Sequence, residues 1–129
     1  MASILRVNTL TDASSNNSIA TSFVAGGSAK AYASINGQST AATRGTFNMS
    51  SLTDNGTGNY TLDITSDMAD TNYTGQLSSG DHSGADDNFS RQYIYSLNTG
   101  NVSALVAAVS SGSLYDATYF GFTIHGDLA

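Results

Sequence analysis

Apolar and polar residues alternate over two stretches of the chain. A dipeptide typical of turns follows the first stretch, and another precedes the second. One stretch is Ala29–Ile35, with apolar residues at its odd positions, and the other is Tyr60–Ile64, with apolar residues at its even positions. Successive side chains of a strand point to opposite faces, so this alternation predicts half-buried strands. Asn36-Gly37 and Asn55-Gly56 are dipeptides that favour tight turns with positive φ. The pattern therefore predicts an antiparallel β-module.

Similar segments, bounded by Gly, Asn and Asp, continue to the C-terminus. The predicted strands are Ala29–Ile35, Thr46–Ser50, Asn59–Thr65, Tyr73–Leu77, Phe89–Leu97, Val102–Ser110 and Tyr115–His125. A change of parity at Ser50-Ser51 predicts a bulge or a strand end. Alanines would also allow a helical turn at Val102–Val109, where we favour a strand. Short strands at this spacing are typical of a sandwich or barrel, and we expect an all-β fold: an antiparallel β-sandwich or jelly-roll-like module of about seven strands with an N-terminal docking arm.

Residues 1–27 form the predicted arm, and residues 28–129 form the β-module. Met1–Thr11 resembles a short strand, whereas residues 12–27 are rich in Ser, Asn and Gly. Aliphatic and aromatic residues recur too often for a solvated tail, although a mobile tail is the alternative. We expect the arm to dock on the module's own sheet, on a neighbouring subunit or on a larger particle. Its candidate assembly-interface residues are Ile4, Leu5, Val7 and Phe23.

The last predicted strand differs from the others because Tyr119, Phe120, Phe122 and Ile124 place apolar side chains on both of its faces. A strand that is apolar on both faces is expected to be buried on both. It is then either a central strand of the module or part of a subunit interface. Phe120 and Phe122 are therefore further candidates for the assembly interface.

Composition narrows the classes of function. The chain has 129 residues, enough for one domain, and a net charge of −6, with four scattered cations and ten acidic residues that are all Asp. This charge argues against binding to a nucleic-acid backbone or an anionic membrane surface. No apolar run is long enough to span a bilayer, and Arg6 interrupts the short apolar patch at the N-terminus, so we expect neither membrane insertion nor a signal peptide. Since Glu is absent and Lys30 is the only lysine, a long helix is not expected.

The segment Asp81–Asn88 holds Asp81, His82, Asp86 and Asp87. Clustered carboxylates can bind Ca²⁺, but the spacing does not match an EF-hand, and a solvated loop is the simpler interpretation. Loops at the end of a β-module also contact receptors, so these four residues are candidate receptor contacts.

Nothing in the sequence indicates an enzyme. There is no cysteine, no Gly-x-Ser-x-Gly motif and no Glu to pair with an Asp as in glycosidases. We therefore expect no catalytic residue, no metal site and no cofactor. Tyr93 and Tyr95 share a parity with Phe89 and Arg91; we interpret them as a stripe of the inter-sheet core, with a binding face as the alternative.

Several segments together resemble the C-terminal domains of bacteriophage tail-fibre and virion appendage proteins. They are Lys30-Ala31-Tyr32, the hairpin Thr53–Tyr60 and the aromatic strand Tyr119–Gly126, within a likeness that covers about three quarters of the chain. Family members usually have a larger apolar residue and an Asn where this chain has Ala33 and Ser34. The resemblance implies a β-domain in a virion, and it transfers no receptor-binding residue.

Three hypotheses follow. The first is a short tail-fibre-type structural protein, made in the host cytoplasm and located in the virion. It would form a homotrimer, bind other virion proteins through its arm, and contact a host surface glycan or protein. The second is a capsid decoration or head-fibre protein, and the third is a soluble carbohydrate-binding adhesin module.

Overall fold

A computed structural model describes residues 3–4, 6–14, 18–80 and 90–129 of the chain. Strands contain 56% of the described residues and helix only 6%, which confirms the all-β prediction. In the arm, the two-stranded sheet β1 (Thr9–Thr11) and β2 (Ser18–Ala20) is followed by the short helix α1 (Thr21–Gly27). Of the described residues of the expected strand Met1–Thr11, only the last three lie in a strand, and the helix was not predicted.

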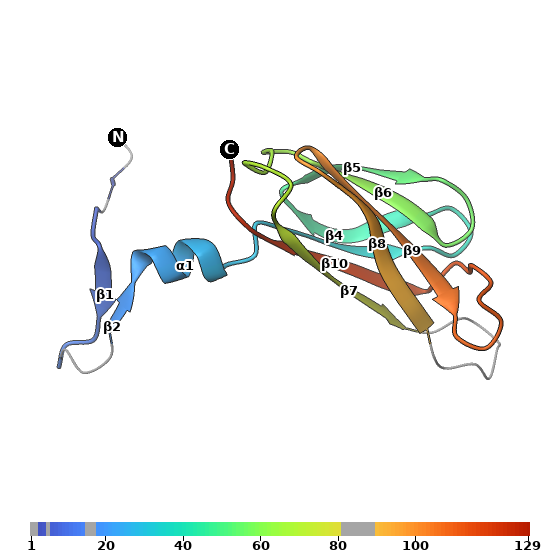
Figure 1. Cartoon of the computed structure of the whole chain (residues 1–129), viewed down its shortest axis with the longest axis horizontal. Helices are drawn as coiled ribbons and strands as arrows, with labels where there is room; N and C mark the ends of the chain where they lie inside the picture. Colours follow the sequence, from blue (N-terminus) through green and yellow to red (C-terminus); the bar gives the residue numbers. More distant parts are fainter. Residues whose placement is uncertain (1–2, 5, 15–17, 81–89) are drawn as a thin grey trace.

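Two four-stranded antiparallel sheets form the β-module (Figure 1). The first has the order β4-β3-β10-β7 and is called the β3–β10 sheet; the second has the order β5-β6-β9-β8 and is called the β6–β9 sheet. The strands are β3 (Ala31–Asn36), β4 (Ala42–Phe47), β5 (Met49–Asp54), β6 (Asn59–Ile64), β7 (Thr74–Gly80), β8 (Ser90–Asn98), β9 (Asn101–Ala108) and β10 (Tyr119–His125). The module is therefore a sandwich of eight strands.

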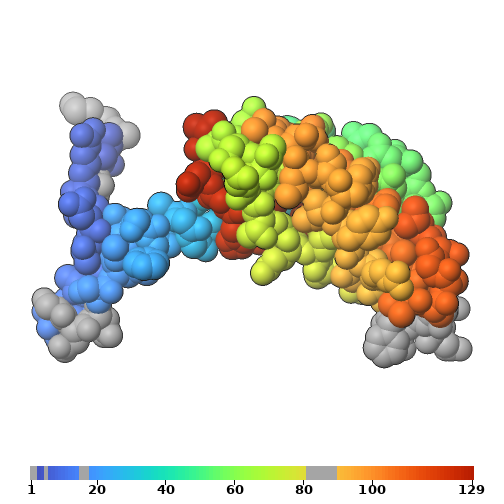
Figure 2. Space-filling model, in the orientation of Figure 1, coloured from blue at the N-terminus to red at the C-terminus, as the bar shows by residue number. Residues whose placement is uncertain are grey.

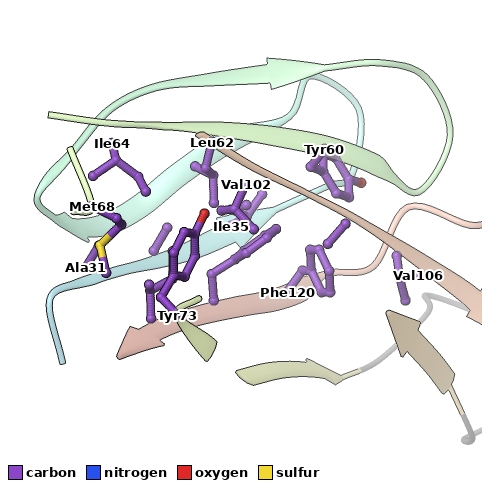
Figure 3. Close-up of a cluster of buried hydrophobic side chains, with 14 of the residues drawn as sticks. Ala31, Ile35, Tyr60, Leu62, Ile64, Met68, Tyr73, Val102, Val106 and Phe120 are labelled. Carbon is purple, nitrogen blue, oxygen red and sulfur yellow. The ribbon is translucent and has the colours of Figure 1, made fainter. Parts of the chain in front are cut away.

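The core lies between the sheets and is supplied mainly by their central strands (Figure 3). Every second residue of β3, β6, β9 and β10 is buried against the opposite sheet: Ala31, Ala33, Ile35, Tyr60, Leu62, Ile64, Val102, Ala104, Val106, Phe120, Phe122 and Ile124. Phe120 packs edge-on against Phe122, with ring centroids 4.9 Å apart. The period-two pattern thus correctly predicted which face of β3 and β6 is buried.

The predicted strand Thr46–Ser50 is wrong, because two strands in different sheets share this segment. β4 ends at Phe47 and β5 begins at Met49, and Asn48 between them has a φ of 54°. The Asn48 amide donates hydrogen bonds to the carbonyls of Lys30 (3.1 Å) and Ser66 (3.2 Å). Asn48 therefore holds the corner at which the chain passes from one sheet to the other. The bulge expected near Ser50 is confirmed by the register shift between Met49 and Ser51.

The two Asn-Gly dipeptides behave differently. Asn55-Gly56 lies in the β5–β6 hairpin, where φ is positive at Gly56 (110°) and Gly58 (62°). Asn36-Gly37 does not form a tight turn, since five residues separate β3 from β4. A glycine is needed at position 37 because any side chain would clash: a Cβ would lie 2.1 Å from the Tyr60 hydroxyl oxygen. In the C-terminal part of the module, Val102 lies in a strand, as predicted, whereas β10 begins at Tyr119 instead of Tyr115.

Candidate functional site

The predicted receptor contacts Asp81, His82, Asp86 and Asp87 lie outside the described residues. Their role, and the question of a cation there, remain predictions. The chain enters this segment directly after Gly80, the last residue of β7, which pairs with Tyr119 of β10.

The predicted interface residues of the arm are exposed where the structure describes them. Ile4 is 75% exposed, Phe23 73% and Val7 39%, while Leu5 lies outside the described part of the chain. α1 has no buried residue. Ser28 N–H donates to the Val24 carbonyl, and Lys30 Nζ donates to the Ala25 carbonyl, where the helix meets the sandwich. Figure 2 shows the arm in blue, standing apart from the body of the sandwich.

Phe120 and Phe122, the other two candidates for the assembly interface, are buried inside the sandwich. They are only 1% and 2% exposed within the single chain, because the β6–β9 sheet covers them. The other face of β10 carries the half-exposed Tyr119 together with Gly121 and Thr123. β10 is a central strand of its sheet, as one of the two interpretations expected, but the expectation that it is buried on both faces is wrong, since Tyr119 is 55% exposed.

Exposed aromatic side chains gather on the outer face of the β3–β10 sheet. Tyr32, Phe47 and Tyr119 are 45–55% exposed, and the Tyr32 and Phe47 rings stack with centroids 6.1 Å apart and an interplanar angle of 22°. The Arg44 guanidinium carbon lies 4.2 Å from the centre of the Tyr119 ring. These four residues are called the aromatic face. Rings and a guanidinium can stack on a ligand and donate hydrogen bonds to it, so the face is suited to recognition.

The second exposed aromatic pair lies on the opposite side of the sandwich. Tyr93 and Tyr95 point outward from the edge strand β8 and are 48% and 49% exposed. The Tyr95 hydroxyl donates to Asn59 Oδ1 at 2.9 Å, and Arg91 is exposed on the same side. The interpretation of Tyr93 and Tyr95 as core residues is therefore wrong. Ile94, between them, is the residue that points inward, toward Gly75.

The most strongly perturbed ionisable group is structural. Tyr60 is fully buried, and its hydroxyl donates to Asp116 Oδ1 at 3.1 Å, which also accepts the Gly58 N–H at 2.7 Å. Burial, together with the negative charge of Asp116, raises the Tyr60 pKa well above its ordinary value. Burial also raises the pKa of Tyr73, whose hydroxyl donates to the Asn98 carbonyl at 2.7 Å. A phenol held neutral in this way fixes a loop to a strand rather than acting as a nucleophile.

Sequence reasoning missed Arg44 because the predicted strand began only at Thr46, and it did not single out Phe47 although that strand included it. The signal for the other two residues was present: Tyr32 and Tyr119 have the opposite parity to their buried neighbours Ala31 and Phe120. What parity could not show is that Arg44 reaches across the sheet to the ring of Tyr119, because the bulge between Ser34 and Ile35 changes the register there.

Within the described ranges, no three His, Cys, Asp or Glu side chains are grouped closely enough to hold a metal ion. No helix in these ranges has the length and apolar character needed to cross a membrane. No protein-family model, curated protein sequence or solved structure matches the chain.

Proposed function

We propose that this chain is a non-enzymatic structural component of a bacteriophage virion, a short tail-fibre-type protein that assembles on the particle and contributes to host attachment. The arm would anchor the protein to other virion proteins and to further copies of itself, as a homotrimer. The sandwich would be displayed outward and would contact the host surface.

The state of the arm is the observation that carries this proposal. β1 and β2 form an isolated pair of three-residue strands, and α1 has seven residues. A two-stranded hairpin and so short a helix are each marginal in water by themselves. Yet the arm exposes large apolar side chains: Ile4, Val7, Leu10, Ile19, Phe23 and Val24. Such a segment is stabilised when a partner covers it, which is what an anchoring role requires.

The sandwich supports the other half of the proposal. It contains its own buried core, to which the described residues of the arm contribute none. It also carries the segments Ser28–Thr65 and Tyr119–Gly126, which resemble the C-terminal domains of tail-fibre and virion appendage proteins. A self-sufficient β-module at the end of an assembly arm is the arrangement expected of an appendage.

Mass spectrometry of gradient-purified particles of the phage that encodes this chain tests the proposal. Peptides of the chain should co-purify with the particles through a second gradient. Recovery only from the soluble fraction of the lysate would contradict the virion role. An antibody against the sandwich then separates tail from capsid by electron microscopy, since label on the head alone would identify a decoration or head-fibre protein.

The aromatic face supports a second candidate, a soluble carbohydrate-binding adhesin module, because exposed rings bind sugars without any need for a particle. Light scattering of the purified chain separates the two candidates. The virion proposal expects a multimer formed through the arm, whereas a free binding module would be monomeric.

A further inference from the structure

The aromatic face is distinguished by what surrounds it. Along β3, Tyr32 and Asn36 point outward on either side of Ser34, and Tyr119 lies next to Asn36 on the neighbouring strand β10. The two aromatic positions are therefore four residues apart along the strand direction, about 13 Å. Small residues cross the sheet between them, since Ser34 pairs with both Gly45 and Gly121. The rings of Tyr32 and Tyr119 thus border a part of the outer surface where the side chains are small.

Charge is distributed unevenly between the two sheets. The strands of the β3–β10 sheet contain no acidic residue, although the chain has ten Asp and a net charge of −6. The β6–β9 sheet carries Asp54 and Asp63. In the part of the chain that the structure describes, Arg44 has no carboxylate partner, and its recorded contact is the ring of Tyr119. An exposed guanidinium among strands that contain no acidic residue can pair with an anionic group of a ligand, such as a carboxylate.

The aromatic face does not have the character of a permanent subunit contact. Interfaces between permanently associated subunits are largely apolar and resemble a divided core. Here the outward side chains around the three rings are, apart from Arg44, neutral and polar or very small, and include Asn36, Ser78 and Thr123. Aliphatic side chains are exposed on the arm instead, among them Ile4 and Ile19. The rings with their hydrogen-bonding neighbours fit a polar ligand that has flat apolar patches.

We propose that the aromatic face binds an acidic polysaccharide whose sugar units carry carboxylates, such as a uronic acid polymer. This inference rests on the proposed role in host attachment and names the ligand class that the sandwich would recognise. Tyr32 and Tyr119 each stack on the C–H side of a sugar ring, with Phe47 supporting Tyr32. Arg44, which lies over the Tyr119 ring, donates paired hydrogen bonds to a carboxylate. The spacing of the two rings requires a chain of sugars rather than a single one.

The test measures binding of the purified full-length chain to oligosaccharides of galacturonate, guluronate and glucuronate, by array and then by calorimetry. Each oligosaccharide is compared with its carboxyl-reduced form, which keeps the sugar linkages but has no charge. At least one acidic form should bind, and the affinity of its reduced form should be lower by roughly tenfold or more. R44Q should cause a loss of the same size for the acidic form and little change for the reduced form.

Matched substitutions on the opposite sheet provide the controls. Tyr93 is exposed to a similar degree as Tyr32 and Tyr119, and Arg91 is an exposed arginine like Arg44. Y32A and Y119A should each weaken binding roughly tenfold, whereas Y93A and R91Q should leave it unchanged. Thermal unfolding of all these variants checks that each one is folded, and none of the substituted positions is buried.

Three results would overturn the inference: no acidic oligosaccharide binds better than its reduced form, R91Q lowers affinity as much as R44Q, or Y119A dissociates a multimer of the chain. The last result would assign the face to contacts between copies. Failure here is distinguishable from failure of the virion role, because detection of the chain in purified particles does not depend on ligand binding. A chain that enters particles but ignores uronates keeps its structural role and loses only this ligand.

Discussion

The arm and the sandwich expose apolar side chains in opposite ways. In the sandwich, the central strands turn their aliphatic residues and Phe120 inward, where the opposite sheet covers them. In the arm, Phe23 and Ile4 are about three-quarters exposed, because two short strands and one short helix have nothing to fold against. Burial of apolar surface drives folding. The sandwich therefore specifies its own structure, whereas the arm depends on what it joins.

Removing the arm is the strongest test of this comparison. A chain starting at Ser28 should keep the cooperative unfolding of the sandwich, since the arm contributes none of the described core residues. Its assembly should be lost completely, which light scattering and incorporation into particles would measure. A truncated chain that no longer folds, or one that still assembles normally, would show that the division at residue 28 is misplaced.

The same substitution in the two regions gives the next largest difference. F120A should lower the free energy of unfolding by about 3–5 kcal/mol, because the ring is almost fully buried against Tyr60 and Phe122. F23A should change the stability of the dissociated chain by less than about 0.5 kcal/mol. Urea denaturation at low protein concentration would compare them. A loss at F120A that grows with dilution would indicate that subunit contacts contribute to its environment.

These differences also mark what the sequence could predict. Strand geometry alone fixes the direction of successive side chains, so alternation correctly placed Ile35, Tyr60 and Leu62 in the core. It could not decide whether Phe120 faces a second sheet of the same chain or another copy. Both environments select the same apolar residue, and only the folded chain shows that β6 and β9 cover it.

Features set by contacts between distant residues were beyond local patterns. The passage from one sheet to the other at Asn48 depends on carbonyls of Lys30 and Ser66, which lie 18 residues away on either side. Arg44 was missed with the strand that contains it. Its stacking on Tyr119 joins positions more than seventy residues apart and follows from the bulge in β3 and β4.

Glycine substitutions compare the two regions at a finer level. G37A should cost about 1–3 kcal/mol, since the added Cβ would lie 2.1 Å from the Tyr60 hydroxyl oxygen and 2.9 Å from the Ala117 carbonyl. In the arm, G26A has open space around it and lies in α1, so it should raise helicity and stabilise the helix by up to about 1 kcal/mol. Chemical denaturation measures the first effect and circular dichroism the second. Combining G37A with Y60F should recover part of the loss, because the clashing oxygen is removed.

The buried tyrosines predict a pH dependence that belongs to the sandwich alone. Tyr60 and Tyr73 have a pKa raised above the ordinary value of 10.0, so the folded state keeps protons that the unfolded state releases. Stability from these groups is complete below pH 10 and falls as the pH rises above it, by at most about 1.4 kcal/mol per pH unit for each tyrosine. Y60F should flatten the fall in unfolding free energy measured between pH 9 and 12. An unchanged slope would mean that Tyr60 ionises in the folded chain as it does in the unfolded one.

The smallest effect concerns the aromatic face, where the comparison predicts that the fold gains little from an exposed contact. Arg44 lies over the Tyr119 ring at 4.2 Å, but both side chains are exposed to water. A double-mutant cycle of R44Q and Y119A should therefore give a coupling energy of only about 0.5–1 kcal/mol. Denaturation of the four proteins at low and high salt measures it. A coupling above about 2 kcal/mol would mean that the pair is part of the structural framework. A small one means that Arg44 and Tyr119 can be replaced without unfolding the sandwich, so their loss can be examined through ligand binding alone.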